Sequence, residues 1–279
     1  MNLGPFNLGL VLRAVREVFW TTVVLALISG AISGLLAYAL PRVQERFMRR
    51  NFIPPGVREF RNAMFGFDGA GSSVSDIAFS LAWSHPIVIA LLSAHAIIVC
   101  TRVLAGEVER GTVDVLLALP VSRLRLFASE TLAWALSAAL LLGAVYAGSW
   151  VGSRFIVEAH RPDFGRLLMV LCNLALVYGV IGTTALFGAV VSDRRVRAVL
   201  ATIILTVFSV LINFLYTLDP SLAFTKHLKF LSVLDYYRPI RMLMEAAWPW
   251  RDMAILGGAI AVLWTSALVV LSRRDITTT

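Results

Sequence analysis

Six long, almost uncharged apolar stretches dominate this chain of 279 residues. A helix needs about 20 apolar residues to cross the hydrocarbon core of a bilayer, and each stretch is of that order. Soluble domains are roughly a quarter charged, whereas only 15% of these residues are charged and 58% are hydrophobic. The sequence therefore predicts an all-α integral membrane protein. Its six expected transmembrane helices are Phe19–Leu40, His85–Leu104, Phe127–Val151, Leu167–Val191, Val199–Leu218 and Met253–Leu271.

The residues before the first span form an amphipathic pattern. Between Pro5 and Phe19, apolar residues recur at helical spacing on one face, and Arg13, Arg16 and Glu17 fall on the other. A helix of this kind lies in the membrane interface rather than across it. We therefore expect an N-terminal interfacial helix over residues 5–19, at the start of a single transmembrane domain that covers residues 1–279.

The connections between the spans are unequal. Residues 41–83 form a long, polar, arginine-rich segment, and residues 105–125 form a shorter charged one. Residues 219–252 are long and unusually apolar, and within them Pro239–Ala247 can form a helix that is too short to cross. We therefore expect a re-entrant or interfacial helical segment before span six. An interfacial aromatic belt suits Tyr236, Tyr237, Trp248 and Trp250.

The basic residues leave the orientation open. An even number of spans puts both termini on one side, and with cytoplasmic termini that side holds 11 of the 25 Lys and Arg residues. The raw count opposes this choice. The positive-inside rule weights short, span-proximal segments, however, and Ser192–Arg197 and Arg273-Arg274 are of that kind. The net charge of +8 fits attraction to anionic lipid headgroups better than it fits nucleic-acid binding.

The most informative segment is Gly106–Arg123, between the second and third spans. Thr112 can cap a short helix, Asp114 favours the positive end of that helix, and Pro120 stops it. Ser122 can cap the helix that follows and runs into the third span. A short helix preceded by charged residues can dock into a groove on a cytoplasmic partner. It can also be an ordinary solvated loop between two helices.

The pattern Glu-x-Glu-Arg-Gly-Thr-x-x-x-Leu-Leu-x-x-Pro-Val-Ser-Arg, which begins at Glu107, resembles the ABC-2 type family of ABC exporter permeases. The ending Arg273-Arg274-Asp275-Ile276, the interfacial N-terminal helix and the segment Tyr236-Tyr237-x-Pro239 are also similar to that family. The resemblance in topology covers the whole chain. The motif itself covers about 20 residues and the tail.

This resemblance implies a division of labour between two kinds of subunit. In such permeases the loop after the second span carries a cytoplasmic coupling helix that contacts a nucleotide-binding subunit. Carried over to this chain, that contact would involve Glu107, Glu109, Arg110, Gly111, Thr112 and Asp114. The resemblance also implies a dimer of permeases around an export pathway, cytoplasmic termini, and a location in the cytoplasmic (inner) cell membrane.

The chain has no phosphate-binding loop of its own. It lacks Gly-x-x-x-x-Gly-Lys-Ser/Thr, and its only lysines, Lys226 and Lys229, stand outside any glycine-rich loop. We therefore expect no ATP hydrolysis and no cofactor in this chain, with ATP and Mg bound by a separate ATPase subunit. The transported substrate is not encoded in any motif, although apolar and aromatic spans favour an amphipathic or lipidic cargo.

Three other readings remain open at this level. A secondary transporter would need carboxylates at mid-membrane depth, and only Glu130, near the start of the third span, approaches that position. A metal site or intramembrane enzyme would have to be built from His85, His95, Cys100 and Cys172. A purely accessory membrane protein would have no ATPase partner.

Polar and small residues inside the spans are the remaining candidates. His95 is expected to hydrogen-bond to a neighbouring helix, and Asn173 and Asn213 either do the same or line a pathway. Two small-residue motifs allow close helix packing, either within one chain or across a dimer. They are Gly30-x-x-x-Gly34 and Gly148-x-x-x-Gly152.

Overall fold

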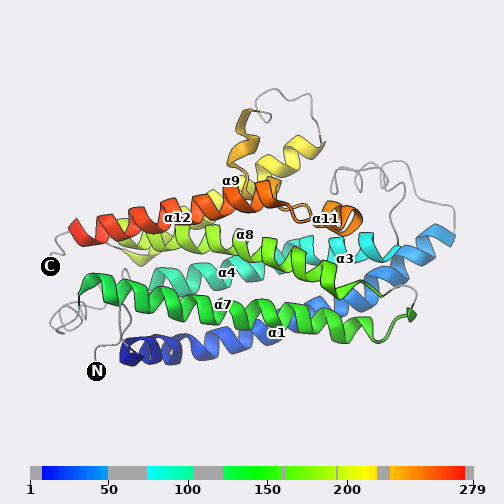
Figure 1. Cartoon of the computed structure of the whole chain (residues 1–279), viewed down its shortest axis with the longest axis horizontal. Helices are drawn as coiled ribbons and strands as arrows, with labels where there is room; N and C mark the ends of the chain where they lie inside the picture. Colours follow the sequence, from blue (N-terminus) through cyan, green and yellow to red (C-terminus); the bar gives the residue numbers. More distant parts are fainter. Residues whose placement is uncertain are drawn as a thin grey trace.

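The protein is an all-helical bundle throughout the part that the computed structural model describes, which comprises residues 8–49, 74–102, 122–158, 161–192, 194–218 and 227–273. Its long helices lie side by side along the longest axis of the molecule (Figure 1). Six candidate membrane spans confirm the predicted number: Leu8–Val43, Asp76–Arg102, Arg123–Ser153, Phe164–Val191, Arg195–Leu215 and Trp250–Arg273.

Helix α1 (Leu8–Arg49) is longer than the sequence analysis predicted at both ends. No break separates residues 8–19 from the first span, so the interfacial position of that segment stays a prediction. The helix also continues through Pro41, where the missing N–H and the proline ring ordinarily end a helix in water. Transmembrane helices tolerate proline, because neighbouring helices and local adjustments of the backbone satisfy the carbonyl that it frees.

The second span consists of two helices, α3 (Val74–Ser84) and α4 (Pro86–Arg102). They meet at His85, whose carbonyl accepts bonds from the N–H groups of Val88 and Ile89 at 2.9 and 3.2 Å. The predicted 41–83 connection is therefore too long, because its first residues belong to α1 and its last ones to α3. The sequence analysis did not predict α3. The structure shows that this helix belongs to the bundle, because its Phe79 and Trp83 side chains are fully buried.

Helix α8 (Phe164–Val191) is the centre of the bundle, as its all-round apolar sequence favours. It packs against α4, α9 (Arg195–Leu218) and α12 (Trp250–Arg273). The side chain of Asp163 caps its first turn by accepting a bond from the N–H of Gly165 at 2.8 Å. The core therefore lies around α8, and the helices around it carry the outward faces.

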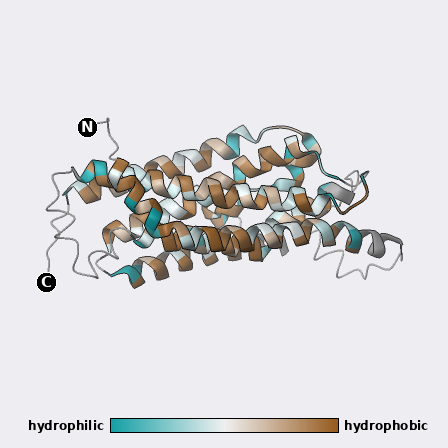
Figure 2. Cartoon of the chain, turned by 90° about the horizontal axis from the view of Figure 1, so that it is seen from below, coloured by the Kyte–Doolittle hydropathy of each residue, from teal (hydrophilic) through white to brown (hydrophobic). Residues whose placement is uncertain are grey.

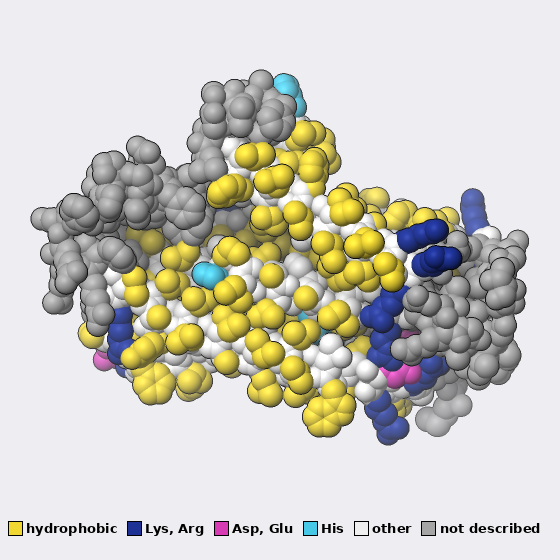
Figure 3. Space-filling view, turned by 180° about the vertical axis from the view of Figure 1, so that it is seen from behind, with side chains coloured by type: hydrophobic (Ala, Val, Ile, Leu, Met, Phe, Trp, Pro, Cys, Tyr) yellow, Lys and Arg dark blue, Asp and Glu magenta, His cyan; other side chains and the backbone are white. Residues whose placement is uncertain are grey.

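The outward faces are apolar over the middle of the bundle. Ile204 and Val207 on α9 and Val262 on α12 are about 60% exposed or more. Hydrophobic side chains form a broad band, and Lys and Arg gather at the two ends (Figure 3). The hydropathy colouring shows the same distribution from another side (Figure 2). This is the surface that a lipid bilayer requires.

Helices α1 and α7 (Arg123–Ser153) approach each other at their glycines. A Cβ atom on Gly30 would lie 2.9 Å from the carbonyl oxygen of Ala144, and one on Gly34 would lie 2.8 Å from that of Gly148. A Cβ atom on Gly148 or Gly152 would overlap the backbone of α1 outright. The two motifs that the sequence singled out thus contact each other within one chain.

Three polar side chains join α1, α3 and α7 beside these glycines. The hydroxyls of Ser33 and Ser149 are 2.6 Å apart, and the indole N–H of Trp83 donates to Ser149 at 2.8 Å. All three residues are buried. The close backbone approach is what allows two short serine side chains to meet.

The described residues before α12 include three short helical segments: η2 (Lys229–Leu231), η3 (Val233–Tyr236) and α11 (Pro239–Glu245). Helix α11 begins with Pro239 at its first turn. It stops two residues earlier than predicted, because Ala246 adopts a left-handed conformation with φ 50°. The Arg166 guanidinium donates to the carbonyl of Leu243 at 3.0 Å and ties α11 to α8. The re-entrant or interfacial position of α11 stays a prediction.

We predict that Gly148→Ala destabilises the bundle, because the added methyl group would force α1 and α7 apart. Overpacking of this kind typically costs about 1–3 kcal/mol. Thermal unfolding of the purified protein in detergent would measure the loss. Gly143→Ala on the same helix is the matched control, since a Cβ there meets nothing within 4 Å. Equal melting temperatures for the two variants would contradict the close contact.

Candidate functional site

Charged residues at the ends of several spans lie together at one end of the bundle. The first turn of α1 and the last turn of α12 lie at this end, together with the end of α4 and the start of α7 (Figure 1). We call it the termini end, and the opposite one the α11 end. Arg102 and Ser122, the described residues on either side of positions 103–121, both lie at this end. The predicted coupling residues Glu107, Glu109, Arg110, Gly111, Thr112 and Asp114 lie outside the described residues.

The first anchor of this connection is Arg102, the last residue of α4. Its guanidinium forms an ion pair with Glu17 of α1. The second oxygen of the same carboxylate accepts a bond from Arg13 Nε at 2.9 Å, one helical turn earlier. Arg102 is mostly buried, with 17% of its side chain exposed. The end of α4 is therefore fixed to α1 through a charge-assisted contact.

The second anchor is the start of α7. The Ser122 hydroxyl accepts a bond from the N–H of Arg125 at 3.3 Å, which confirms the predicted cap. The Arg123 guanidinium donates to the carbonyl of Leu271 in the last turn of α12 at 2.9 Å. A cation at the C-terminal end of a helix is favourable, because the unpaired carbonyls there carry partial negative charge. The connection therefore returns to a position tied to α12.

A third contact brings α9 to the same place. The Arg195 guanidinium donates to the hydroxyl of Thr101 at 3.5 Å and to the carbonyl of Ile98 at 3.3 Å. The start of α9 is thus held against the last turn of α4. The sequence analysis used Arg102, Arg123 and Arg195 only to judge the orientation of the chain and did not predict that they link helices. Their positions next to the ends of spans could have indicated this role.

A buried polar cluster joins four helices inside the bundle. The Nε2 atom of His95 lies 3.1 Å from the Thr22 hydroxyl, and its Nδ1 atom lies 2.8 Å from the Tyr178 hydroxyl. The indole N–H of Trp134 donates to the same Tyr178 oxygen at 2.7 Å. We call these four residues the His95 cluster; α1, α4, α7 and α8 each contribute one. The prediction that His95 bonds to a neighbouring helix is confirmed.

The bonds in the His95 cluster fit a neutral imidazole. Trp134 can only donate, so the Tyr178 oxygen accepts from it and its hydroxyl is free to donate to Nδ1 of His95. The Nε2 atom then carries the hydrogen and donates to the Thr22 oxygen. This tautomer is assigned from the network, and it gives the Trp134 N–H, the Tyr178 hydroxyl and the His95 N–H an acceptor each. Gly182 makes room for it, because a Cβ there would overlap the Trp134 ring.

The other predicted intramembrane residues lie apart from this network. Asn173 on α8 is completely buried, and neither its oxygen nor its nitrogen has a hydrogen-bond partner among the described residues. Asn213 is half-buried on α9. Both ring nitrogens of His95 are engaged by Thr22 and Tyr178, and the described part of the chain brings no three His, Cys, Asp or Glu side chains together as a metal site would require.

These observations define a multi-pass helical membrane protein whose charged end anchors a connection between its second and third spans. A family model described as ABC-2 family transporter protein matches residues 14–276. The chain belongs to this family, which confirms the resemblance found in the sequence and makes the chain an ABC-2 type transporter protein of the membrane. Comparisons with curated proteins and with solved structures found no match.

We predict that Tyr178→Phe lowers stability more than an ordinary hydroxyl deletion does. It leaves both the Trp134 N–H and the His95 Nδ1 atom without a partner, and each unsatisfied buried group costs about 1–3 kcal/mol. The matched control is Tyr146→Phe, which removes a single bond to the carbonyl of Phe164. Chemical denaturation in lipid nanodiscs would compare the two, and a smaller loss for Tyr178→Phe would contradict the cluster.

Proposed function

We propose that this chain is the permease subunit of an ABC exporter, driven by a separate ATPase subunit. The observation that carries the proposal is the family match over residues 14–276, because it includes almost the whole of all six candidate spans. The sequence contributes a second argument, since it contains no phosphate-binding loop. ATP and Mg would then be bound by the partner, and this chain would supply the pathway as one half of a permease dimer.

In this proposal, the residues between Arg102 and Ser122 receive the movement of the ATPase. A displacement of their first end would pass through the Arg102–Glu17 ion pair to α1. A displacement of their second end would pass along α7 and through Arg123 to α12. ATP-driven closure of the partner would thereby favour one packing of the helices over another, which is a shift of a conformational equilibrium.

The proposal also fixes an orientation. A cytoplasmic ATPase requires the termini end to face the cytoplasm. The arginines of the short, span-proximal segments at that end favour this orientation under the positive-inside rule, whereas the raw count of Lys and Arg opposes it. The inner membrane of a cell is the expected location. Glu130 lies two turns into α7 from the same end. It is therefore poorly placed for the mid-membrane carboxylate that an ion-coupled secondary transporter would use.

We predict that the chain, purified from its native membrane, brings an ATPase subunit with it and hydrolyses no ATP after that subunit is removed. The reason is the absence of a phosphate-binding loop in its own sequence. Phosphate release by the complex and by the isolated chain would be measured side by side. Robust hydrolysis by the isolated chain would refute the proposal, and so would transport that persists without any ATPase.

We further predict that Arg102→Gln weakens the coupling between the permease and the ATPase. Loss of this contact is expected to change the permease-dependent part of the ATPase rate on the order of three- to ten-fold. Arg13→Gln is the matched control, because Arg13 pairs with the same carboxylate but lies on the same helix as Glu17. Equal effects of the two substitutions would show that the link between α1 and α4 plays no part in coupling.

A further inference from the structure

The second span is broken at one position, and the break has a local cause. Helix α3 ends at Ser84 and α4 begins at Pro86, whose ring nitrogen carries no hydrogen. A proline suits the first turn of a helix and disfavours the helical conformation of the residue before it. His85 accordingly lies between the two helices. We call residues 83–87 the joint of span two.

The start of α4 is satisfied within the joint itself. The carbonyl of His85 accepts bonds from the N–H groups of Val88 and Ile89 at 2.9 and 3.2 Å. The Nδ1 atom of its imidazole accepts a bond from the N–H of Ile87 at 3.3 Å. The first N–H groups of a helix have no partner inside that helix, so a residue that accepts from them stabilises its start. His85 therefore caps α4 from within the span.

The end of α3 is satisfied from outside the span. In an unbroken helix the Trp83 carbonyl would accept a bond from the N–H of Ile87, but that N–H bonds to His85. The hydroxyl of Tyr237, which lies between η3 and α11, donates to the Trp83 carbonyl at 3.4 Å. A carbonyl without a partner is costly in a bundle that lipid surrounds. Tyr237 therefore supplies a bond that the break removes from α3.

The Trp83 side chain holds the same end of α3 against α7. It is fully buried, and its indole N–H donates to the Ser149 hydroxyl at 2.8 Å. Its ring lies edge-on to the ring of Tyr146 on the same helix, with centroids 6.3 Å apart. Helix α3 thus ends in a contact with α7 through its last large side chain and in a contact with Tyr237 through its backbone.

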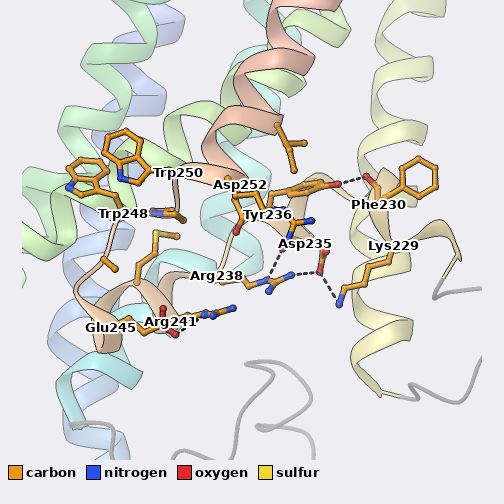
Figure 4. Close-up of a pocket in the computed structure, with 15 residues that line it drawn as sticks. Lys229, Phe230, Asp235, Tyr236, Arg238, Arg241, Glu245, Trp248, Trp250 and Asp252 are labelled. Carbon is orange, nitrogen blue, oxygen red and sulfur yellow. Dashed lines mark hydrogen bonds and ion pairs between the residues drawn. The ribbon is translucent and has the colours of Figure 1, made fainter.

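The segment that carries Tyr237 is itself firmly positioned. Tyr237 is only 7% exposed, and its backbone N–H donates to the Leu234 carbonyl at 3.1 Å. Next to it, Arg238 donates to the Asp235 carbonyl at 2.8 Å and pairs with the Asp235 carboxylate at 3.3 Å (Figure 4). Helix α11 follows directly and is tied to α8 by Arg166. The Tyr237 hydroxyl is therefore presented to the joint by a segment attached to the centre of the bundle.

We infer that the Tyr237 hydroxyl is a latch on the joint, and that its release allows α3 to change its angle to α4. The 3.4 Å between the two oxygens is long for a hydrogen bond of this kind, so the bond is weak enough to open. The bonds that His85 accepts lie on the α4 side of the joint and can persist when α3 moves. The latch goes beyond the proposed function, which makes no use of Tyr237.

Distances between two spin labels in the full-length chain would test the latch. The labels replace Leu81 on α3 and the exposed Ile98 on α4, so the pair spans the joint, and alanines replace Cys100 and Cys172. In lipid nanodiscs we expect one dominant distance and a minor second one. Tyr237→Phe should raise the minor population about three-fold, because one weak hydrogen bond is lost. The phenyl ring fills the same buried volume, so the variant is expected to fold.

Tyr236→Phe is the matched control for the loss of a tyrosine hydroxyl. Tyr236 donates to the Phe230 carbonyl at 2.9 Å and makes this bond away from the joint (Figure 4). Its substitution should leave the populations of the two distances unchanged. Unchanged populations in Tyr237→Phe would overturn the latch, and so would an equal change in the two variants.

A second label pair separates a local latch from general support of the bundle. Leu27 on α1 and Leu140 on α7 are both exposed and lie away from the joint. Their distance should be the same in the wild type and in Tyr237→Phe. If this distance broadens as much as the first one, the hydroxyl stabilises the whole bundle and the latch is refuted. The measurement needs neither ATP nor a partner subunit, so its outcome is independent of the proposed function.

Discussion

Lipid offers no hydrogen-bond partner, so a polar group inside this bundle is stabilised where it finds one within the chain. The His95 cluster does so between α1, α4, α7 and α8, and Ser33, Ser149 and Trp83 do so between α1, α3 and α7. Each bond fixes the rotation of two helices about their own axes. These bonds therefore add directional constraints to the packing of the helices.

Helix α1 connects the features that bear on function. Along its length it presents Glu17 to the end of α4, Thr22 to His95, and Gly30 and Gly34 to α7. A movement delivered at the termini end therefore reaches the middle of the bundle through one continuous helix. Its partner α7 is bound so closely that the two backbones touch. The two helices therefore form one closely packed pair.

Hydropathy was enough to predict the six spans, because length and apolar composition are properties of each segment by itself. The cap at Ser122 and the short helix at Pro239 were also predictable, because each depends only on a few neighbouring residues in the sequence. The partners of His95 could not be predicted. Thr22, Trp134 and Tyr178 reach His95 only because of how the four helices are rotated relative to one another. The continuation of α1 through Pro41 was missed because the rule for proline comes from helices in water. Lys229 and Arg238 both form ion pairs with Asp235 in the short helical segments before α12, and no periodicity in the sequence predicts these pairs.

The interruption at His85 divides the second span into two halves that share α1 but otherwise have different neighbours. The half that follows the interruption also packs against α8 and α9, and the half that precedes it also packs against α11. An unbroken helix beside a translocation pathway would make the two ends of that pathway widen or narrow together. A span with a break carries no such constraint. In the proposed transporter, one end of the pathway could therefore close before the other end opens.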